Sequence, residues 1–269
     1  MTAMTNVAAR YLRILYAQLR SSLLLTLQYR ADFVLEGLVE ALSVTTFFIP
    51  LFVVYATRRA IGGFTFGEAL VVTGWFTVLQ GVIEGAISPS VLSIVEHVRK
   101  GTLDFVLLKP ADAQFLVSTA RFQPWRATNV LTGCGVFVYA FHLLGRTPSW
   151  GGLFAALGLF ACALVVLYSL WILTASAAFY VVKVDNLTYL FGAVFDAARW
   201  PATVFRGAVR FVFTFVLPFA MMTTFPAEAL LGRLAARDAA LAVGIAAVFA
   251  LASRAVWRGA IRNYTSAGG

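Results

Sequence analysis

Residues 147–182 contain no Asp, Glu, Lys or Arg, and this uncharged run constrains the fold more than any other feature of the sequence. A helix needs about 20 residues to cross a lipid bilayer, and the run is longer than that. Residues 33–57 form a second apolar run without Lys or Arg. Charged residues make up 12% of the chain, about half their usual share of about 25% in soluble domains. We therefore expect an all-α, polytopic membrane protein.

Six segments are apolar and long enough to be predicted as transmembrane helices: residues 33–56, 68–93, 128–145, 152–182, 209–225 and 237–257. With the N-terminus in the cytoplasm, sixteen of the 21 Lys and Arg residues fall on the cytoplasmic side of these spans. Cytoplasmic loops of membrane proteins are enriched in basic residues. This orientation is therefore favoured, and it places the C-terminus in the cytoplasm as well.

Three other segments are predicted to lie at the membrane surface. Residues 1–32 place leucines at helical spacing and arginines on another face, which indicates an amphipathic interfacial helix; an Arg-rich organelle transit peptide is the alternative. Residues 183–210 carry several charges and the pair Trp200-Pro201, so we expect an interfacial elbow on the cytoplasmic side. Residues 226–236 are too few to cross a bilayer and predict a short re-entrant helix at the outer surface before the last span.

The segment 96–112, EHVRKGTLDFVLLKPAD, is the most polar part of the chain, because six of its seventeen residues are charged. It lies between the second and third predicted spans, on the side assigned to the cytoplasm. One interpretation is a solvated basic loop held at the lipid headgroups, as in many membrane proteins. The other is a surface that binds a cytosolic partner.

The sequences VRKGTLDFVLLKP, ARWPATVF and LPFAMMTTFPAEALLG resemble the permease subunits of ABC-2 type ABC transporters. The resemblance implies one permease domain over residues 1–269 with a type V exporter-like fold, in the cell membrane of a bacterium. It also implies two P-loop ATPase subunits and a second permease, identical or homologous, as partners. The transported molecule is then expected to be a hydrophobic or amphiphilic small molecule or a lipid, and the direction export.

In such a permease, residues 96–116 would be the coupling segment that docks on the ATPase. Docking needs an apolar stripe to bury and charges to set the register. The stripe is predicted at Leu103, Val106 and Leu107. The charges are predicted at Arg99, Lys100, Asp104 and Lys109.

Motifs that would make this chain an enzyme are absent from the sequence. It contains no GxxxxGK[ST] phosphate loop, so ATP and Mg²⁺ are expected on the partner ATPase, and no cofactor on this chain. We predict no catalytic residues and no metal ligands. The basic residues lie in short segments between apolar runs, so nucleic acid is not expected as a partner, whereas membrane lipids are.

Several residues inside the predicted spans could line a substrate path. They are Glu36, Glu40, Glu84, Phe211 and Phe215. The alternatives are that Glu36 and Glu40 pair with Arg30 or another basic residue at the inner headgroups and that the phenylalanines face lipid or other helices. Gly81 and Gly85 form a GxxxG pattern that allows close helix packing, either within the chain or between two permeases.

Two other classes of function compete with an ATP-driven permease. The first is a secondary transporter or channel that works without ATP, which the lack of evident inverted repeats disfavours. The second is a membrane-embedded enzyme that acts on lipids, which the lack of a paired acid or nucleophile disfavours.

Overall fold

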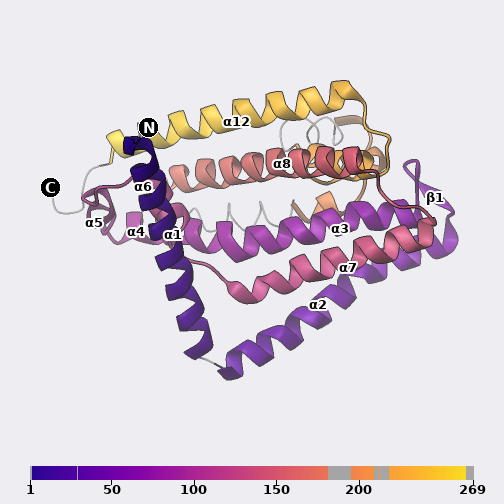
Figure 1. The fold of residues 1–269 in the computed structure, drawn as a ribbon, viewed down its shortest axis with the longest axis horizontal. Coiled ribbons are helices and arrows are strands. Elements are labelled where there is room, and N and C mark those ends of the chain that lie inside the picture. Colours follow the sequence, from indigo (N-terminus) through magenta and orange to yellow (C-terminus); the bar gives the residue numbers. More distant parts are fainter. Residues whose placement is uncertain (1, 29, 181–194, 209–211, 213–217, 265–269) are drawn as a thin grey trace.

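The computed structural model describes residues 2–28, 30–180, 195–208, 212 and 218–264. Long helices lie side by side along the longest dimension of the molecule, and one long helix, α1 (Thr2–Gln28), crosses them at one end (Figure 1). The two-stranded hairpin of β1 (Ala60–Ile61) and β2 (Phe64–Thr65) lies at the opposite end. These two ends are called the α1 end and the hairpin end.

Most of the described chain is helical. The remaining long helices are α2 (Arg30–Thr57), α3 (Phe66–Val82), α4 (Ser88–Arg99), α7 (Ala127–Leu144), α8 (Trp150–Ala177) and α12 (Ala236–Arg262). A π-helical turn, η1 (Ile83–Ile87), joins α3 to α4. The short helices are α5 (Asp104–Leu107), α6 (Ala113–Ser118), η2 (Pro124–Arg126), η3 (Asp196–Arg199), η4 (Ala202–Val204), η6 (Ala220–Thr224) and α11 (Phe225–Leu230).

Four helical segments of the described chain are long and apolar enough to cross a membrane: Phe66–Arg99, Pro124–Leu144, Trp150–Ala177 and Ala236–Arg262. They correspond to the predicted spans 68–93, 128–145, 152–182 and 237–257. The predicted span 33–56 falls within α2, where Phe48–Thr57 is a shorter apolar segment. Most of the predicted span 209–225 lies outside the described residues. The protein is thus mostly helical, with four long helices that could span a bilayer.

Glycines let α3 and α7 pack closely against each other. A Cβ on Gly74 would meet the ring of Phe137, and a Cβ on Gly81 would meet the side chain of Asn129 at 3.0 Å. Close approach of small residues is a common way for membrane helices to associate. The GxxxG pattern therefore serves packing inside the chain, because Gly85 also faces Arg126 of the same chain.

The structure corrects the predicted cytoplasmic elbow in its described part. The hydroxyl of Thr203 donates to the carbonyl oxygen of Gly62 at 2.6 Å, so η4 lies at the hairpin end. The ring of Phe195 packs against the rings of Phe76 and Phe219 inside the helix bundle. Aromatic burial thus places η3, with Arg199, away from the basic α1 end that the charge count had assigned to it.

The short helix before the last span exists, but its bounds differ from the predicted 226–236. Helix α11 ends at Leu230, and Gly232 follows it with a φ of +70° that favours glycine. Pro226 and Ala227 are buried, and a Cβ on Gly152 of α8 would lie 2.7 Å from the carbonyl oxygen of Ala229. The helix is therefore covered by protein, as a non-spanning helix at membrane depth needs to be.

Candidate functional site

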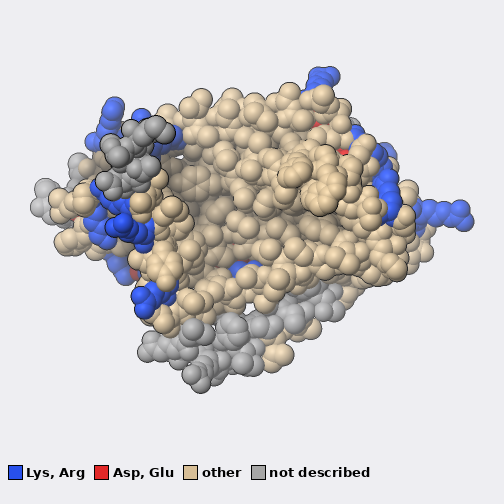
Figure 2. Space-filling model, viewed as in Figure 1, with Lys and Arg blue, Asp and Glu red and all other residues tan. Residues whose placement is uncertain are grey.

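Lysines and arginines gather at the two ends of the molecule, while the middle of the face in Figure 2 is almost free of charge. The α1 end holds the predicted coupling segment 96–116, which forms the end of α4, helix α5 and helix α6. The charge pattern fits a bundle whose middle lies in lipid and whose ends lie in water.

A glycine-based turn ends α4 and starts the coupling segment. Gly101 has a φ of +65°, and its N–H donates to the carbonyl oxygen of Val98 at 3.3 Å. The N–H of Thr102 donates to the carbonyl oxygen of His97 at 3.0 Å, and the side chains of these two residues lie 2.8 Å apart. This is the Schellman arrangement, in which a residue with positive φ satisfies the last carbonyls of a helix.

The structure revises the predicted apolar stripe. Leu103 is 0% exposed and Val106 8% exposed, so both belong to the core of this chain, and Leu107 is half-buried. The exposed apolar side chains of the segment are instead Phe105, which is 70% exposed, and Leu108, which is 81% exposed. Leu103 and Val106 thus hold α5 onto the bundle, and Phe105 and Leu108 face outward.

The predicted charges divide in a similar way. Arg99, Lys100 and Lys109 are exposed, whereas Asp104 is half-buried. Lys100 pairs with Glu96 at 2.6 Å on the same face of α4, which is a surface ion pair of small energetic value. The negative charge of Asp104 adds to the burial that raises the pKa of Tyr264, a residue that follows helix α12.

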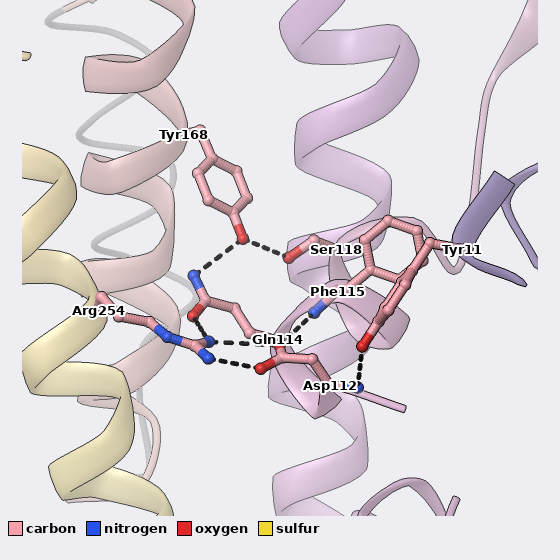
Figure 3. A network of polar contacts seen from close by, with 7 residues as sticks. All are labelled: Tyr11, Asp112, Gln114, Phe115, Ser118, Tyr168 and Arg254. Carbon is pink, nitrogen blue, oxygen red and sulfur yellow. Dashed lines mark hydrogen bonds and ion pairs between the residues drawn. The ribbon is translucent and has the colours of Figure 1, made fainter. Parts of the chain in front are cut away.

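Asp112 connects the coupling segment to α12. Its carboxylate accepts the N–H of Phe115 at 3.0 Å and so caps α6. The same carboxylate is held by both terminal nitrogens of Arg254, with Nη1 lying 3.3 Å from Oδ1 and Nη2 pairing with Oδ2 (Figure 3). The hydrogen bond from Arg254 is the main reason that the pKa of Asp112 lies below its ordinary value.

Gln114 extends this connection to α8. Its amide oxygen accepts from Arg254, and its amide nitrogen donates to the hydroxyl of Tyr168 at 3.0 Å (Figure 3). The hydroxyls of Tyr168 and Ser118 lie 2.8 Å apart. One polar network therefore joins α6, α8 and α12. We call the set of Asp112, Gln114, Ser118, Tyr168 and Arg254 the inner network.

Helix α1 is attached to the same segment. The N–H of Asp112 donates to the hydroxyl of Tyr11 at 3.1 Å, and the ring of Tyr11 packs edge-on against Phe115. Gln18 donates to the carbonyl oxygen of Leu116 at 3.2 Å and accepts from Thr119 at 2.6 Å. The spacing of leucines and arginines predicts an interfacial helix here but not this attachment, because the sequence pattern around Tyr11 and Gln18 does not identify their partners.

The predicted substrate-path residues are only partly described. Glu84 lies in the π-helical turn η1, where it pairs with Arg126 at 2.7 Å and accepts from Gln80 at 3.1 Å. The side chains of Glu36 and Glu40, and all of Phe211 and Phe215, lie outside the described residues.

At the hairpin end, the carboxylate of Glu68 contacts residues of three segments that connect helices or strands. It accepts the N–H of Thr65 at 3.0 Å and lies 3.5 Å from Arg146 and 3.3 Å from Arg233. Its side chain is 12% exposed. Two arginines therefore surround one nearly buried carboxylate, which fixes the ends of α3, α7 and α11 relative to one another.

Within the part of the chain that the structure describes, no three His, Cys, Asp or Glu side chains are grouped so that they could hold a metal ion. A family model described as ABC-2 family transporter protein matches residues 41–268. Neither a curated protein nor a solved structure matches the chain significantly.

Proposed function

The chain belongs to the ABC-2 family of transporter membrane proteins, and on that premise we propose that it is the permease subunit of an ATP-driven exporter. Two ATPase subunits with P-loops would bind ATP and Mg²⁺, and two permeases would form the pathway. A hydrophobic or amphiphilic small molecule or lipid would be the cargo. The complex would lie in the cell membrane of a bacterium, with the α1 end in the cytoplasm.

The exposed surface of the coupling segment carries this proposal. Phe105 and Leu108 present apolar side chains to solvent, and the exposed cations Lys100 and Lys109 lie on either side of them in the sequence. Protein interfaces are typically built from an apolar centre with a polar rim. An exposed surface of this kind suits a groove on an ATPase better than a lipid surface, because it follows Arg99, the last residue of a helical segment that could cross the membrane.

The attachment of the coupling segment supports a mechanical role. A displacement of α5 and α6 by the ATPase would pass through Asp112 and Arg254 to α12 and through Gln114 and Tyr168 to α8. Leu103, which is fully buried, would carry the same movement into the core. Rigid-body movements are transmitted by such packed and hydrogen-bonded contacts.

The test replaces the exposed apolar residues Phe105 and Leu108, called the apolar tip, and measures how much ATPase co-purifies with the chain. The double variant Phe105→Ser with Leu108→Ser should lose co-purification with a P-loop ATPase expressed in the same cells. The matched control, Leu131→Ser with Val138→Ser, changes two residues of α7 that are 71% and 73% exposed along a predicted span. This control should retain the ATPase. Normal ATPase recovery with the tip variant would contradict the docking site.

A transport assay addresses the energy source. The permease alone in liposomes should not move an amphiphilic cargo, and the complex with its ATPase should move it only when ATP is hydrolysed. Transport by the permease alone would favour the rival class, a secondary transporter or channel.

A further inference from the structure

A cavity of about 620 Å³ lies beside the inner network, where α1, α6, α8 and α12 meet. The space-filling face in Figure 2 is hollowed near the α1 end. The volume of the cavity is within the range of small-molecule sites, which is roughly 300 to 1,000 Å³. The coupling segment supplies only one wall, so the cavity is separate from the proposed ATPase surface at Phe105 and Leu108.

One side of the cavity is polar and is built by the inner network. Ser118, Tyr168 and Arg254 all line it. The guanidinium of Arg254 can only donate, so the amide oxygen of Gln114 faces it and the amide nitrogen of Gln114 donates to Tyr168.

In this arrangement one hydroxyl proton of the Tyr168 and Ser118 pair is not used within the pair. The hydroxyls of Tyr168 and Ser118 make one hydrogen bond with each other, which uses one of their two protons. The other proton is available to a ligand whichever hydroxyl donates. The guanidinium of Arg254, which carries a positive charge, also lines this side of the cavity.

The carboxylate and amide oxygens on this side already accept hydrogen bonds within the chain. The two carboxylate oxygens of Asp112 are held by Arg254, with a further hydrogen bond from the N–H of Phe115. The amide oxygen of Gln114 is also held by Arg254. The remaining hydroxyl proton of Ser118 or Tyr168 is thus open to an acceptor on a ligand, and the +9 net charge of the chain favours an anion.

The other part of the lining is largely apolar. It includes Leu15 of α1, Ile87 of η1, Phe115 of α6, Phe122 and Val165 of α8. This apolar wall belongs to the bundle near its α1 end, so a ligand with an apolar part could enter from the adjoining lipid leaflet.

We propose that the cavity binds an acyl amphiphile with an anionic, hydrogen-bond-accepting headgroup. The headgroup lies at Ser118, Tyr168 and Arg254, and the acyl chain lies along Ile87, Phe122 and Val165. The site belongs to the permease alone, so its occupation does not depend on the proposed ATPase docking.

Native mass spectrometry of the purified full chain in detergent tests this site without any ATPase. The probes are palmitoyl lysophosphatidic acid, monopalmitoylglycerol, which lacks the phosphate, and glycerol 3-phosphate, which lacks the acyl chain. The lysophosphatidic acid should bind at least about tenfold more tightly than either of the others, because a hydrogen bond to a charged group is worth about one order of magnitude in affinity.

Two variants locate the binding. Ser118→Ala with Tyr168→Phe removes both hydroxyls at nearly constant shape and should weaken lysophosphatidic acid binding about tenfold. Ala250→Phe places a ring in the cavity from α12 and should abolish binding. Tyr139→Phe removes a hydroxyl from a half-exposed residue of α7 and serves as the control, which should bind as the natural chain does.

Three results would overturn the site. They are unchanged binding in the double hydroxyl variant, equal binding of monopalmitoylglycerol, and binding of glycerol 3-phosphate as tight as that of the lysolipid. The last result would indicate a site for free anions in place of an amphiphile site. If Ala250→Phe does not fold, which its thermal midpoint would show, the hydroxyl variant decides alone.

Discussion

The guanidinium of Arg254 holds the carboxylate of Asp112, a residue 142 positions earlier in the chain. The pair joins α12 to the N-cap residue of α6, and both side chains are about one-third exposed, at 36% and 35%. Bidentate pairs between arginine and a carboxylate are among the stronger hydrogen-bonded contacts in proteins. This pair is therefore the contact through which the coupling segment and α12 are expected to move together.

A double-mutant cycle measures that pair. Asp112→Asn and Arg254→Gln should each lower the free energy of unfolding, and their coupling energy should be about 1 kcal/mol, because both side chains are partly exposed to solvent. Unfolding in mixed detergent micelles gives these energies. The control cycle uses Glu96 and Lys100, whose side chains are 43% and 65% exposed, and its coupling should be smaller than that of Asp112 and Arg254. Equal coupling in the two cycles would show that Arg254 and Asp112 form only a surface pair.

The same pair predicts a dependence of stability on pH. Arg254 keeps the pKa of folded Asp112 below its ordinary value. A carboxylate whose pKa is lowered by folding stabilises the protein above its unfolded pKa, near about 4, and this stabilisation is lost as the pH falls through the folded pKa. As the pH is lowered below about 5, the thermal midpoint of the natural chain should therefore fall more than the thermal midpoint of Asp112→Asn. Parallel curves for the two proteins would rule this linkage out.

Two leucines of the coupling segment should behave in opposite ways. Leu103→Ala removes a fully buried side chain and should cost about 2 to 5 kcal/mol of unfolding free energy. Leu108→Ala changes an 81% exposed side chain and should change stability by less than about 0.5 kcal/mol, while weakening ATPase association. Unfolding and co-purification are measured on the same preparations. A stable Leu103→Ala protein that loses the ATPase would restore the predicted stripe.

Two neighbouring glycines of α7 form a matched pair. A Cβ on Gly133 would clash with the side chain of Val78 and lie 3.0 Å from the carbonyl oxygen of Gly74, whereas a Cβ on Gly135 would meet open space. Gly133→Ala should therefore destabilise the protein by about 1 to 3 kcal/mol. Gly135→Ala should be neutral or stabilise it by up to about 1 kcal/mol, since alanine favours helix. The thermal midpoints of the two variants in detergent compare them directly, and similar midpoints would argue against close packing of α3 and α7.

The carboxylate of Glu68 is expected to hold the connections at the hairpin end. Glu68→Gln keeps a hydrogen-bond acceptor for the N–H of Thr65 but removes the charge that attracts Arg146 and Arg233. Hydrogen–deuterium exchange should rise in residues 145–149 and 232–235, because both segments lose an ion pair. Asp238→Asn, at the start of α12, is the control and should leave exchange in residues 145–149 unchanged. Unaltered exchange in both segments of the Glu68 variant would mean that packing alone fixes them.

Local patterns were enough to predict the helical membrane class, four of the spans and the position of the polar segment. Uncharged runs and clusters of basic residues are properties of consecutive residues, and the bilayer selects directly for both. The prediction of a cytoplasmic elbow at residues 183–210 was wrong in its described part, because it too relied on local charge. The charge of Arg199 suggested the cytoplasm, but the packing of Phe195 between two other aromatic rings decided where that stretch lies.

The sequence by itself determined that the chain is a helical membrane protein of the ABC-2 family with a charged segment between two spans. Only the tertiary structure decided which residues of that segment face outward and that Asp112 meets Arg254. Helix α5 has only four residues, so its pattern could not separate a buried face from an exposed one. Leu103 belongs to the hydrophobic core cluster of the chain, while Phe105 and Leu108 are exposed, and only the packed structure distinguishes these positions.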